Sequence, residues 1–565
     1  MPHFITQSCC SDGSCVYACP VNCIHPTPDE PGFRTAEMLH IDPVTCVDCG
    51  ACVSACPVGA IAPESKLTTA QLPFIEINSS FYPERPPTEK LPPTSKLARV
   101  VEAPLIRPRR GGPLRVAVVG SGPAAMYAAD ELLTQRGVVV DVFERLPAPY
   151  GLVRAGVAPD HQTTKRVTRL FDRMSRDRDF HFYLNVEVGQ HISHEELLRH
   201  HHAVLYAVGA SADRRLDIPG FGLPGTATAT EVVAWYNAHP EFAGLPVALD
   251  RERVVIVGNG NVALDVARIL TTDPRMLAGT DVSRTALSAL RDSKVREVVV
   301  AARRGPAQSA FTLPEMIGLA SSSRVVLGAA DHDLVRAELA ACTDALTRHK
   351  LELLSSLEVA DDPQQDPDDA PRIRLAYRLT PRRVLGSARA EGIEFVVTGT
   401  DETRELDAGL LLSSIGYRGR PVTGLPFDEA AAVVPNHAGR VVDQKTGAPV
   451  PGSYVAGWIK RGPTGFIGTN KSCAQETVNA LVDDYNRGLL ADPDGTPAGL
   501  DRLVRDRQPD VVDRAGWRVI DRAEIERGEA DGKPRDKFTT VAEMLAVAAG
   551  PRPRPRHRLA ALLRG

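Results

Sequence analysis

Cysteine is the residue type whose spacing in this sequence most plainly indicates chemistry. Nine of the eleven cysteines fall between Cys9 and Cys56, and the run from Cys46 to Pro57 reads Cys-x2-Cys-x2-Cys-x3-Cys-Pro. Three thiolates two residues apart can wrap one iron–sulfur cubane, while the fourth ligates a neighbouring cluster. A disulfide framework suits small secreted domains, and zinc sites rarely use an unbroken triple spacing. The segment therefore predicts iron–sulfur clusters.

The upstream half of this segment repeats only part of the pattern. Cys15-x3-Cys19-Pro20 matches the end of the run and indicates an internal duplication in which each half lends its last cysteine to the other's cluster. Between Cys9 and Cys15 no well-spaced middle cysteine is found, because adjacent Cys10 shares the reach of Cys9. The expected ligands are Cys46, Cys49, Cys52 and Cys19 for one [4Fe–4S] cluster, and Cys56, Cys15 and Cys9 for a second cluster, either [3Fe–4S] or [4Fe–4S].

A glycine-rich turn between two apolar runs gives a second chemical signal. Residues 115–144 read RVAVVGSGPAAMYAADELLTQRGVVVDVFE, a pattern of strand, turn, helix and strand. Gly120 can adopt turn angles that a Cβ resists, and Gly122 lets a pyrophosphate approach the backbone at the start of the helix. Glu144 ends the second strand, where a carboxylate accepts hydrogen bonds from an adenosine ribose. This pattern predicts a dinucleotide whose ribose carries free hydroxyl groups.

A second turn of the same kind lies further along the chain. Residues 253–270 read RVVIVGNGNVALDVARIL, with Gly258 and Gly260 at the fingerprint positions. The next strand ends in Arg303 and Arg304 instead of an acid, and guanidinium groups match a ribose 2′-phosphate. The 45 residues from Gly258 to Arg303 imply an insertion within this unit. The pair of motifs therefore predicts FAD at the first site and NADPH at the second.

Two glycine-rich and aromatic segments accompany the first motif. Residues 147–161 read PAPYGLVRAGVAPDH, a loop composition expected to shape the cofactor pocket. Asp160 and His161 at its end are candidates for handling the flavin proton, although a histidine beside an aspartate is also a common structural pair. Residues 454–471 read YVAGWIKRGPTGFIGTNK, and Trp458 is placed to stack on an isoalloxazine or nicotinamide ring.

The composition narrows the class of protein. A chain of 565 residues with 43% hydrophobic and 24% charged residues is expected to form two to four globular domains. Its net charge of -4 argues against nucleic acid or a membrane as the main partner. Residues 1–66 carry a balance of -5, so the acidity is concentrated there. Because neither a long apolar run nor a signal peptide is found, a cytoplasmic location is expected.

These motifs must be positioned by an α/β architecture. We expect two Rossmann-like dinucleotide-binding domains, the NADP domain inserted in the FAD domain, preceded by a small α+β two-cluster domain. The expected boundaries are 1–66 for the iron–sulfur domain, 67–113 for a Pro-rich linker, 114–215 and 410–490 for the FAD domain, 216–409 for the NADP domain, and 491–565 for a C-terminal helical extension with a basic tail.

Several longer phrases carry a family resemblance. PYGLVRAGVAPDH, GNGNVALDVARIL, ARRGPAQSAFTLPE, SSIGYRGRP and GWIKRGPTGFIGTNKS resemble those of adrenodoxin-reductase-type ferredoxin–NADP reductases, over most of residues 115–490. The front segment resembles a seven-iron bacterial ferredoxin, in which an extra cysteine such as Cys23 often goes unligated. The fusion is similar to the two-module form found in actinobacteria.

The resemblance implies a set of cofactor contacts and one departure. Relatives commonly carry a second acid three residues after the position of Glu315, where this chain has Gly318. The implied FAD contacts, with the fingerprint glycines, are Gly120, Gly122, Pro123, Glu144, Leu152, Val188, Trp458, Gly465, Phe466 and Ile467. The implied NADP contacts are Gly258, Asn259, Gly260, Asn261, Arg303, Arg304, Glu315 and Gly465.

The function expected is that of a ferredoxin–NADP reductase. NADPH gives a hydride to FAD, and single electrons pass through the clusters to or from a ferredoxin or another one-electron carrier. A monomer is expected. One alternative, a disulfide reductase, needs a Cys-x2-Cys in the flavoprotein part, where Cys342 and Cys473 are solitary. Two others are an electron-entry subunit of a larger enzyme complex and an iron–sulfur sensor without turnover.

Overall fold

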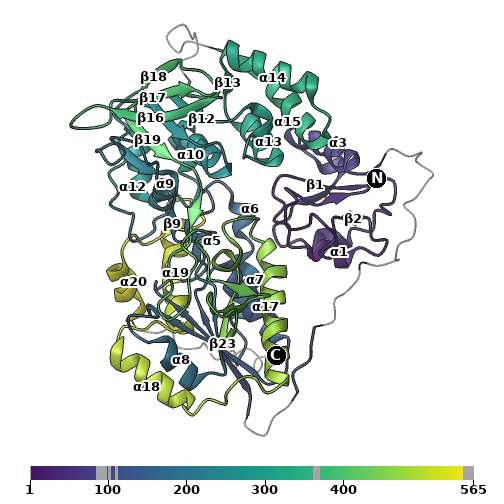
Figure 1. Cartoon of the computed structure of the whole chain (residues 1–565), viewed down its shortest axis with the longest axis vertical. Helices are drawn as coiled ribbons and strands as arrows, with labels where there is room; N and C mark the ends of the chain where they lie inside the picture. Colours follow the sequence, from purple (N-terminus) through teal and green to yellow (C-terminus); the bar gives the residue numbers. More distant parts are fainter. Residues whose placement is uncertain (1, 84–97, 99–102, 108–111, 361–369, 551–565) are drawn as a thin grey trace, which may run out of the picture.

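A computed structural model describes residues 2–83, 98, 103–107, 112–360 and 370–550 of the chain. Two larger nucleotide-binding domains lie one above the other along the longest axis, and the small N-terminal module lies beside them, in contact with both (Figure 1). No described helix is both long and apolar enough to cross a bilayer. The α/β fold class expected from the sequence is confirmed.

The N-terminal module is built from two halves with matching backbones 37 residues apart. Ser11 and Asp48 both have φ 56°, and Gly13 and Gly50, which precede the two short helices, both have φ 72°. Strand β1 pairs with β4, and β2 pairs with β3, all antiparallel. The elements are β1 (His3–Ile5), α1 (Ser14–Ala18), β2 (Ile24–His25), β3 (His40–Ile41), α2 (Ala51–Ala55) and β4 (Ile61–Pro63). The duplication inferred from cysteine spacing therefore extends to the strands, turns and helices of the two halves.

Part of the expected linker is helical and belongs to this module. After η1 (Glu64–Lys66) and η2 (Thr69–Gln71), helix α3 (Pro73–Ser80) begins at a proline, which the first turn of a helix tolerates. Phe74 and Ile77 of α3 are buried in the module core. The amide of Asn78 joins β1 to β3, because it accepts from Ile5 N and Ile41 N. Most of the remaining Pro-rich segment lies outside the described residues.

The first nucleotide domain contains a seven-stranded sheet in the order β21-β22-β23-β8-β5-β6-β7. Strand β5 is buried along its whole length and pairs in parallel with β6 and β8, as an apolar run covered on both faces should. Its elements are β5 (Leu114–Val119), α4 (Pro123–Leu133), β6 (Val138–Glu144), α5 (Gly151–Ala155), α6 (Gln162–Lys165), α7 (Thr168–Met174), β7 (Phe180–Leu184), α8 (His194–His200), β8 (Ala203–Tyr206), β21 (Asn436–His437), β22 (Arg440–Val442), β23 (Pro449–Val455), α16 (Trp458–Arg461) and α17 (Thr469–Asn486).

The second nucleotide domain is inserted after β9 (Ala212–Asp213), which pairs with β20 (Tyr417–Arg418) at the crossing between the domains. Its main sheet has the order β10-β19-β11-β12-β15-β13-β14. Its elements are β10 (Thr226–Thr228), α9 (Ala229–Tyr236), β11 (Arg253–Val257), α10 (Asn261–Thr271), α11 (Pro274–Leu277), α12 (Arg284–Arg291), β12 (Glu297–Ala301), η3 (Pro306–Gln308), α13 (Leu313–Ser322), β13 (Val325–Leu327), α14 (Ala329–Ala341), α15 (Ala345–Ser355), β14 (Glu358–Val359), β15 (Arg372–Ala376), β16 (Leu379–Leu385), β17 (Gly392–Val397), β18 (Thr403–Asp407) and β19 (Leu410–Ser413).

The return to the first domain differs from the expected position at residue 410. Strand β19 is the fully buried run LLLS, and it pairs in parallel with both β10 and β11. The chain therefore leaves the second domain only after Ser413. The sequence could not place this crossing, because an apolar run does not reveal which of two sheets will bury it.

The C-terminal helices join the two nucleotide domains instead of forming a separate extension. They are α18 (Pro497–Arg507), α19 (Arg514–Ala530) and α20 (Val541–Ala548), and Trp517 lies in the core of the first domain. Glu524 is fully buried and pairs with Arg154 of α5 at 2.5 Å. Lys537 pairs with Asp281 of the second domain at 2.9 Å. The expected basic tail lies outside the described residues.

Candidate active site

A cavity inside the N-terminal module is lined by five thiols. Cys19, Cys46, Cys49 and Cys52, the four ligands expected for one cluster, line it together with Cys23. The Sγ atoms of Cys19 and Cys23 lie 3.4 Å apart. Hydrogen bonding from the Cys23 thiol lowers the pKa of Cys19 to about 6 and that of Cys46 to about 5. Burial instead raises the pKa of Cys52 to about 11. Four thiols around a hollow fit a [4Fe–4S] cluster, and Cys23 is suited to donate hydrogen bonds to Cys19 and Cys46 from outside it.

The second expected ligand set also gathers in the module. Burial raises the pKa of Cys9 to about 11, and the neighbouring charge of Cys56 adds to this rise. Burial also raises the pKa of Cys15, to which the charge of Cys9 contributes. All eleven cysteines of the chain are free thiols. Each of these buried thiolates disfavours the ionisation of the others, and a bound cation that replaces their protons removes this repulsion. This second set of thiols therefore also fits an iron–sulfur cluster.

Asp12 stands in this second set where the first set has Cys49. The 37-residue repeat that relates Ser11 to Asp48 places Asp12 at the position of Cys49. Its carboxylate is buried and accepts from Ser14 Oγ at 2.5 Å. The upstream half therefore reads Cys9-x2-Asp12-x2-Cys15-x3-Cys19-Pro20, the complete run with one carboxylate. The spacing of Asp12 is readable in the sequence, but a carboxylate is an unusual iron–sulfur ligand, so the cysteine pattern does not reveal it.

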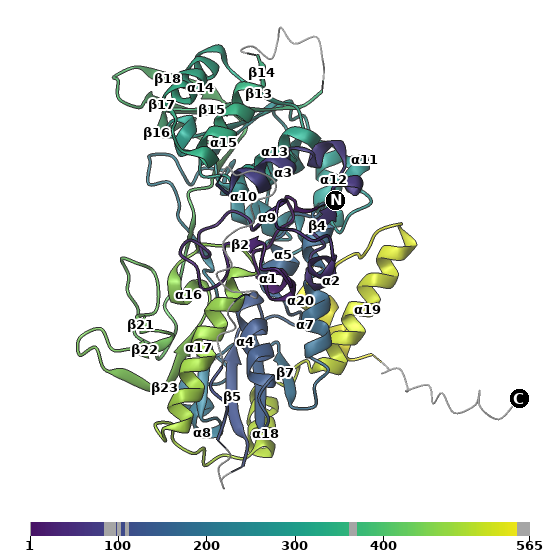
Figure 2. The ribbon, with the colours of Figure 1, turned by 90° about the vertical axis from the view of Figure 1, so that its right-hand side faces the viewer.

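The second ligand set lies against the first nucleotide domain. Gly468 N, at the start of α17, donates to Cys10 O at 2.8 Å. A Cβ atom on Gly468 would lie 2.5 Å from that oxygen and would also collide with the backbone of Asp12. Lys471 Nζ donates to Ser14 Oγ at 2.8 Å. Cys10 belongs to the buried core of the first nucleotide domain, with Cys9, Cys56 and Ile467 packed against it. Figure 2 shows the module above the paired helices α4 and α17.

The first glycine motif has the geometry of a dinucleotide turn. Gly120 has φ +100°, and a Cβ there would lie 2.6 Å from Ala207 O. Gly122 is the N-cap of α4, which Pro123 begins, and no side chain caps the helix. Glu144 lies at the end of β6, where its Oε2 accepts from Ser121 Oγ at 2.7 Å. The acid is thus adjacent to the glycine turn, as a ribose-binding carboxylate must be.

The other residues expected at the flavin come from several elements. Leu152 is an exposed residue of α5, and Val188 forms an isolated bridge with Ile192. Trp458 begins α16, its ring packs 5.0 Å from that of Tyr417, and its Nε1 donates to Thr464 O at 3.1 Å. Gly465 has φ +79° and leads through Phe466 and Ile467 into α17. Helix α17 packs along α4 (Figure 2), and a Cβ on Gly457 would lie 2.5 Å from that of Ala124, in the first turn of α4.

The second glycine motif repeats the geometry of the first. Gly258 has φ +113°, and a Cβ there would overlap Ser414 O. Gly260 is the N-cap of α10. Asn261 Oδ1 accepts from Thr312 N at 2.8 Å, and Asn259 Oδ1 accepts from Ala310 N at 3.3 Å. The two asparagines therefore hold the loop before α13 over the start of α10.

Arg303 and Arg304 follow β12 at the edge of this second site. Both are exposed, and among the described residues neither guanidinium has an ion-pair partner. Their backbones are fixed instead, because Thr398 Oγ1 donates to Arg303 O and Arg378 N donates to Arg304 O. Two cations on a fixed backbone are suited to a phosphate on the ribose.

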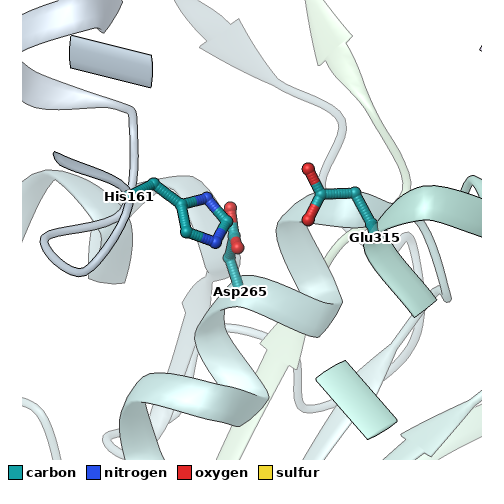
Figure 3. Close-up of side chains that lie close together, drawn as sticks. All are labelled: His161, Asp265 and Glu315. Atoms are coloured by element: carbon teal, nitrogen blue, oxygen red, sulfur yellow. The ribbon is translucent and has the colours of Figure 1, made fainter. Parts of the chain in front are cut away.

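His161, Asp265 and Glu315 meet where the two nucleotide domains face each other (Figure 3). One ligand atom from each lies within 4.8 Å of the others. His161 comes from the loop before α6, while Asp265 and Glu315 come from α10 and α13. Burial raises the pKa of Glu315, and the charge of Asp265 adds to this rise. The group can therefore hold a proton between the two domains.

Arg268 of α10 organises the first-domain side of this group. Its Nε donates to Asp160 Oδ2 at 2.7 Å, and its Nη2 donates to His161 Nε2 at 3.0 Å. Burial acts to raise the pKa of Asp160, but pairing with Arg268 outweighs it and lowers that pKa. Because an imidazole nitrogen that accepts from a guanidinium carries no proton, the proton of neutral His161 resides on Nδ1.

Comparison with known proteins places both parts of the chain. The family model "4Fe-4S dicluster domain" matches residues 8–60, and "Pyridine nucleotide-disulphide oxidoreductase" matches residues 114–283. The "Probable ferredoxin/ferredoxin--NADP reductase" of Mycobacterium tuberculosis is 68% identical over 565 residues, covering 100% of this chain and 98% of the relative. The "NADPH:adrenodoxin oxidoreductase, mitochondrial" of Arabidopsis thaliana is 38% identical over 479 residues, covering 80% of this chain and 99% of the relative.

A solved structure is similar to the larger part of the chain. "Mycobacterium tuberculosis FprA in complex with NADPH" aligns with a TM-score of 0.71 and 40% identity, covering 78% of this chain and 100% of that chain. By sequence, "NADPH-ferredoxin reductase FprA" of that organism is 42% identical over 466 residues.

Proposed function

We propose a path for the electrons in this chain, which belongs to the adrenodoxin-reductase type of ferredoxin–NADP reductases, with a 4Fe-4S dicluster module at its front. It is a ferredoxin–NADP reductase that binds FAD and NADP(H). In the proposed path, the Cys9–Cys15–Cys56 site, here called the near site, stands between the flavin and the Cys19–Cys46–Cys49–Cys52 site, here called the far site. When bound, the flavin takes a hydride from NADPH and releases electrons singly, which iron–sulfur clusters can carry. The far site then exchanges electrons with a ferredoxin or another one-electron carrier.

The observation that carries this order is the contact between Gly468 and Cys10. It joins the residue after Cys9 directly to the segment that follows Ile467, and both Cys9 and Ile467 pack against one core. The Cys19–Cys46–Cys49–Cys52 cavity shares no lining residue with this contact, and Cys49, which lines it, is exposed. The Cys9–Cys15–Cys56 site is therefore proposed to be the one nearer the flavin, and the Cys19–Cys46–Cys49–Cys52 site the one farther from it.

Anaerobic titration with NADPH, followed by absorbance and EPR, tests the proposal. Flavin bleaching accompanied by reduction of both clusters supports it, whereas bleaching without any cluster reduction contradicts it. The alternative, an electron-entry subunit of a larger complex, predicts that the protein co-elutes with a larger assembly on gel filtration of cell extract.

We propose that the first glycine turn and the turns around Trp458 and Gly465 hold FAD. Between Gly120 and Pro123, a Cβ at Gly122 would meet no atom within 4 Å, which leaves the backbone open to a pyrophosphate, and Glu144 accepts from Ser121 Oγ of the same turn at 2.7 Å. Leu152, Val188, Trp458 and the segment 465–467 are proposed to enclose the remainder of the flavin. Gly465 has a left-handed φ that favours glycine, and a Cβ there would lie 2.9 Å from the side chain of Thr469.

We propose that NADP(H) is held by the second glycine turn from Gly258 to Asn261, with Arg303 and Arg304 on the 2′-phosphate. Glu315 and Gly465 are proposed to face its nicotinamide end. Hydride transfer needs orientation more than a nucleophile, and these residues come from both domains, so they can align the reactants. Asp160 is held ionised by Arg268, which leaves His161, with its Nδ1 proton, as the candidate for proton exchange at the flavin.

Glu37 links the position of the N-terminal module to the NADP site. Its Oε2 accepts from Leu313 N at 2.7 Å at the start of α13, and its Oε1 pairs with Lys350 at 3.3 Å. Loss of a helix cap costs about 1 kcal/mol, so we expect Glu37→Ala to raise the KM for NADPH about fivefold with a smaller change in kcat. Glu37→Gln keeps the acceptor and should stay near wild type, as should exposed Glu64→Ala. An unchanged KM in Glu37→Ala contradicts this coupling.

Asp12 is proposed to make the near site a three-iron site. A carboxylate is a harder and weaker ligand to a cubane corner than a thiolate, so we expect a [3Fe–4S] EPR signal from the oxidised wild-type protein. In Asp12→Cys, the fourth thiolate should remove that signal and raise the iron content, because an oxidised [4Fe–4S]²⁺ cluster is EPR-silent. Asp12→Asn should keep the signal. A silent oxidised wild type with the same iron content as Asp12→Cys would refute this assignment.

A further inference from the structure

The duplicated module has two equivalent faces, and only one of them is covered. We call residues 10–12 the inner face, and residues 47–49 with Val53 the outer face; the first three are related to 47–49 by the 37-residue repeat. The inner face is buried against Gly468 and Lys471 of the first nucleotide domain. On the outer face, Val47 is 51% exposed and Val53 is 37% exposed.

The counterparts of the two outer-face valines are buried. Cys10, the counterpart of Val47, is 5% exposed because it packs into the core of the first nucleotide domain, whereas Val16, the counterpart of Val53, is buried in the core of the module itself. Scattered single apolar residues are ordinary on a protein surface, but these two valines flank Cys49, an exposed thiol of the far site. A large apolar side chain on each side of a redox ligand indicates a contact surface.

We propose that the outer face is the docking surface for a one-electron carrier protein whose own docking face is basic. This inference rests on the proposed function, since it assigns the place where electrons leave or enter the far site. The equivalent inner face already shows how a protein contacts such a surface. There the flavoprotein contributes the backbone of Gly468 and one cation, Lys471. A carrier on the outer face meets the same backbone shape.

Charge selects the kind of carrier. Residues 1–66 carry a balance of -5, and of their acids Asp48 lies on the outer face, with 47% of its side chain exposed and its Oδ1 2.9 Å from His3 Nδ1. A field of this sign attracts a basic partner and speeds its association. A second copy of this chain is disfavoured as the occupant, because a two-fold contact would bring two acidic modules together.

The test uses the full chain with both clusters and FAD, and cytochrome c as a basic one-electron carrier. We expect Val47→Lys/Val53→Lys to weaken cytochrome c binding, measured without NADPH, by about tenfold or more, because like charges now face each other. The KM for cytochrome c in NADPH-driven reduction should rise equally, while ferricyanide reduction and cluster EPR stay unchanged. Met276→Lys, on a residue 72% exposed in the second nucleotide domain, is the matched control and should change neither.

Each outcome decides the proposal. Unchanged binding and KM in the double variant, with intact clusters, overturn it. A wild-type dimer that dissociates in the double variant overturns it in favour of a second copy as the occupant. If the double variant loses its clusters, Val53→Lys alone gives the same test. Failure of NADPH to reduce the clusters would refute the proposed function, while the binding measurement would still judge the docking surface.

Discussion

Gly468→Val is expected to slow reduction of the clusters by NADPH about a hundredfold, the scale on which a displacement of one ångström acts. A Cβ at this position would lie 2.5 Å from Cys10 O, and both atoms belong to backbones that are fixed on either side. Gly468 has φ -72°, which any residue adopts, so the side chain acts on the contact between module and flavoprotein and not on the turn itself. Stopped-flow absorbance under anaerobic conditions measures the rate.

Reduction of ferricyanide by the same variant should remain near wild type, because the flavin end of the turn is unchanged. Gly279→Ala is the control, since a Cβ at that position meets no atom within 4 Å. Equal cluster reduction in Gly468→Val and wild type would show that electrons do not cross at Cys10. Parallel loss of ferricyanide reduction would show damage to the flavin site instead.

Replacing Arg303 and Arg304 together by alanine is expected to lower kcat/KM for NADPH about a hundredfold, because a hydrogen bond to a charged group contributes about 1.5–3 kcal/mol and two such groups are removed. Activity with NADH, which lacks the 2′-phosphate, should change little. The two side chains are exposed and solvent screens them, which is why we expect less than the full sum. Steady-state kinetics with both nucleotides at low and moderate salt measure the effect.

The double variant should also lose the preference of the enzyme for NADPH over NADH. Arg275→Ala, a change to another exposed arginine of this domain, should leave both activities unchanged. An equal loss of activity with NADPH and NADH would mean that the arginines support the fold and do not read the phosphate. Retention of full NADPH activity would place the 2′-phosphate elsewhere.

The sequence predicted the parts of the fold whose residues are constrained by local chemistry. Gly120 and Gly258 are needed because a positive φ and a neighbouring carbonyl exclude any Cβ, and such positions leave a readable spacing. The cysteines around the cavity are similarly fixed by ligand geometry. The family and its reductase activity, expected from longer phrases, are confirmed by relatives that align over nearly all of their length.

The features that the sequence did not reveal depend on contacts between distant segments. Glu37 caps a helix 276 residues away, and nothing near it in the sequence indicates that partner. Helix α3 was hidden because it begins a proline-rich segment that reads as a linker, although Pro73 occupies the one helical turn that accepts proline. Lys537 and Asp281 are ordinary charged residues until the fold buries them together. Asp12 differs from these residues, because its position is indicated by the spacing of the neighbouring cysteines.

Because its two halves differ, the module cannot be rotated by half a turn against the flavoprotein, which matters when it is fused to another reductase. Rotated by half a turn, it would place the branched side chain of Val47 where the smaller side chain of Cys10 now packs into the core of the flavoprotein. A chimaera that joins this module to a different reductase therefore has one workable orientation, and the length of the fused connection has to be chosen to reach it.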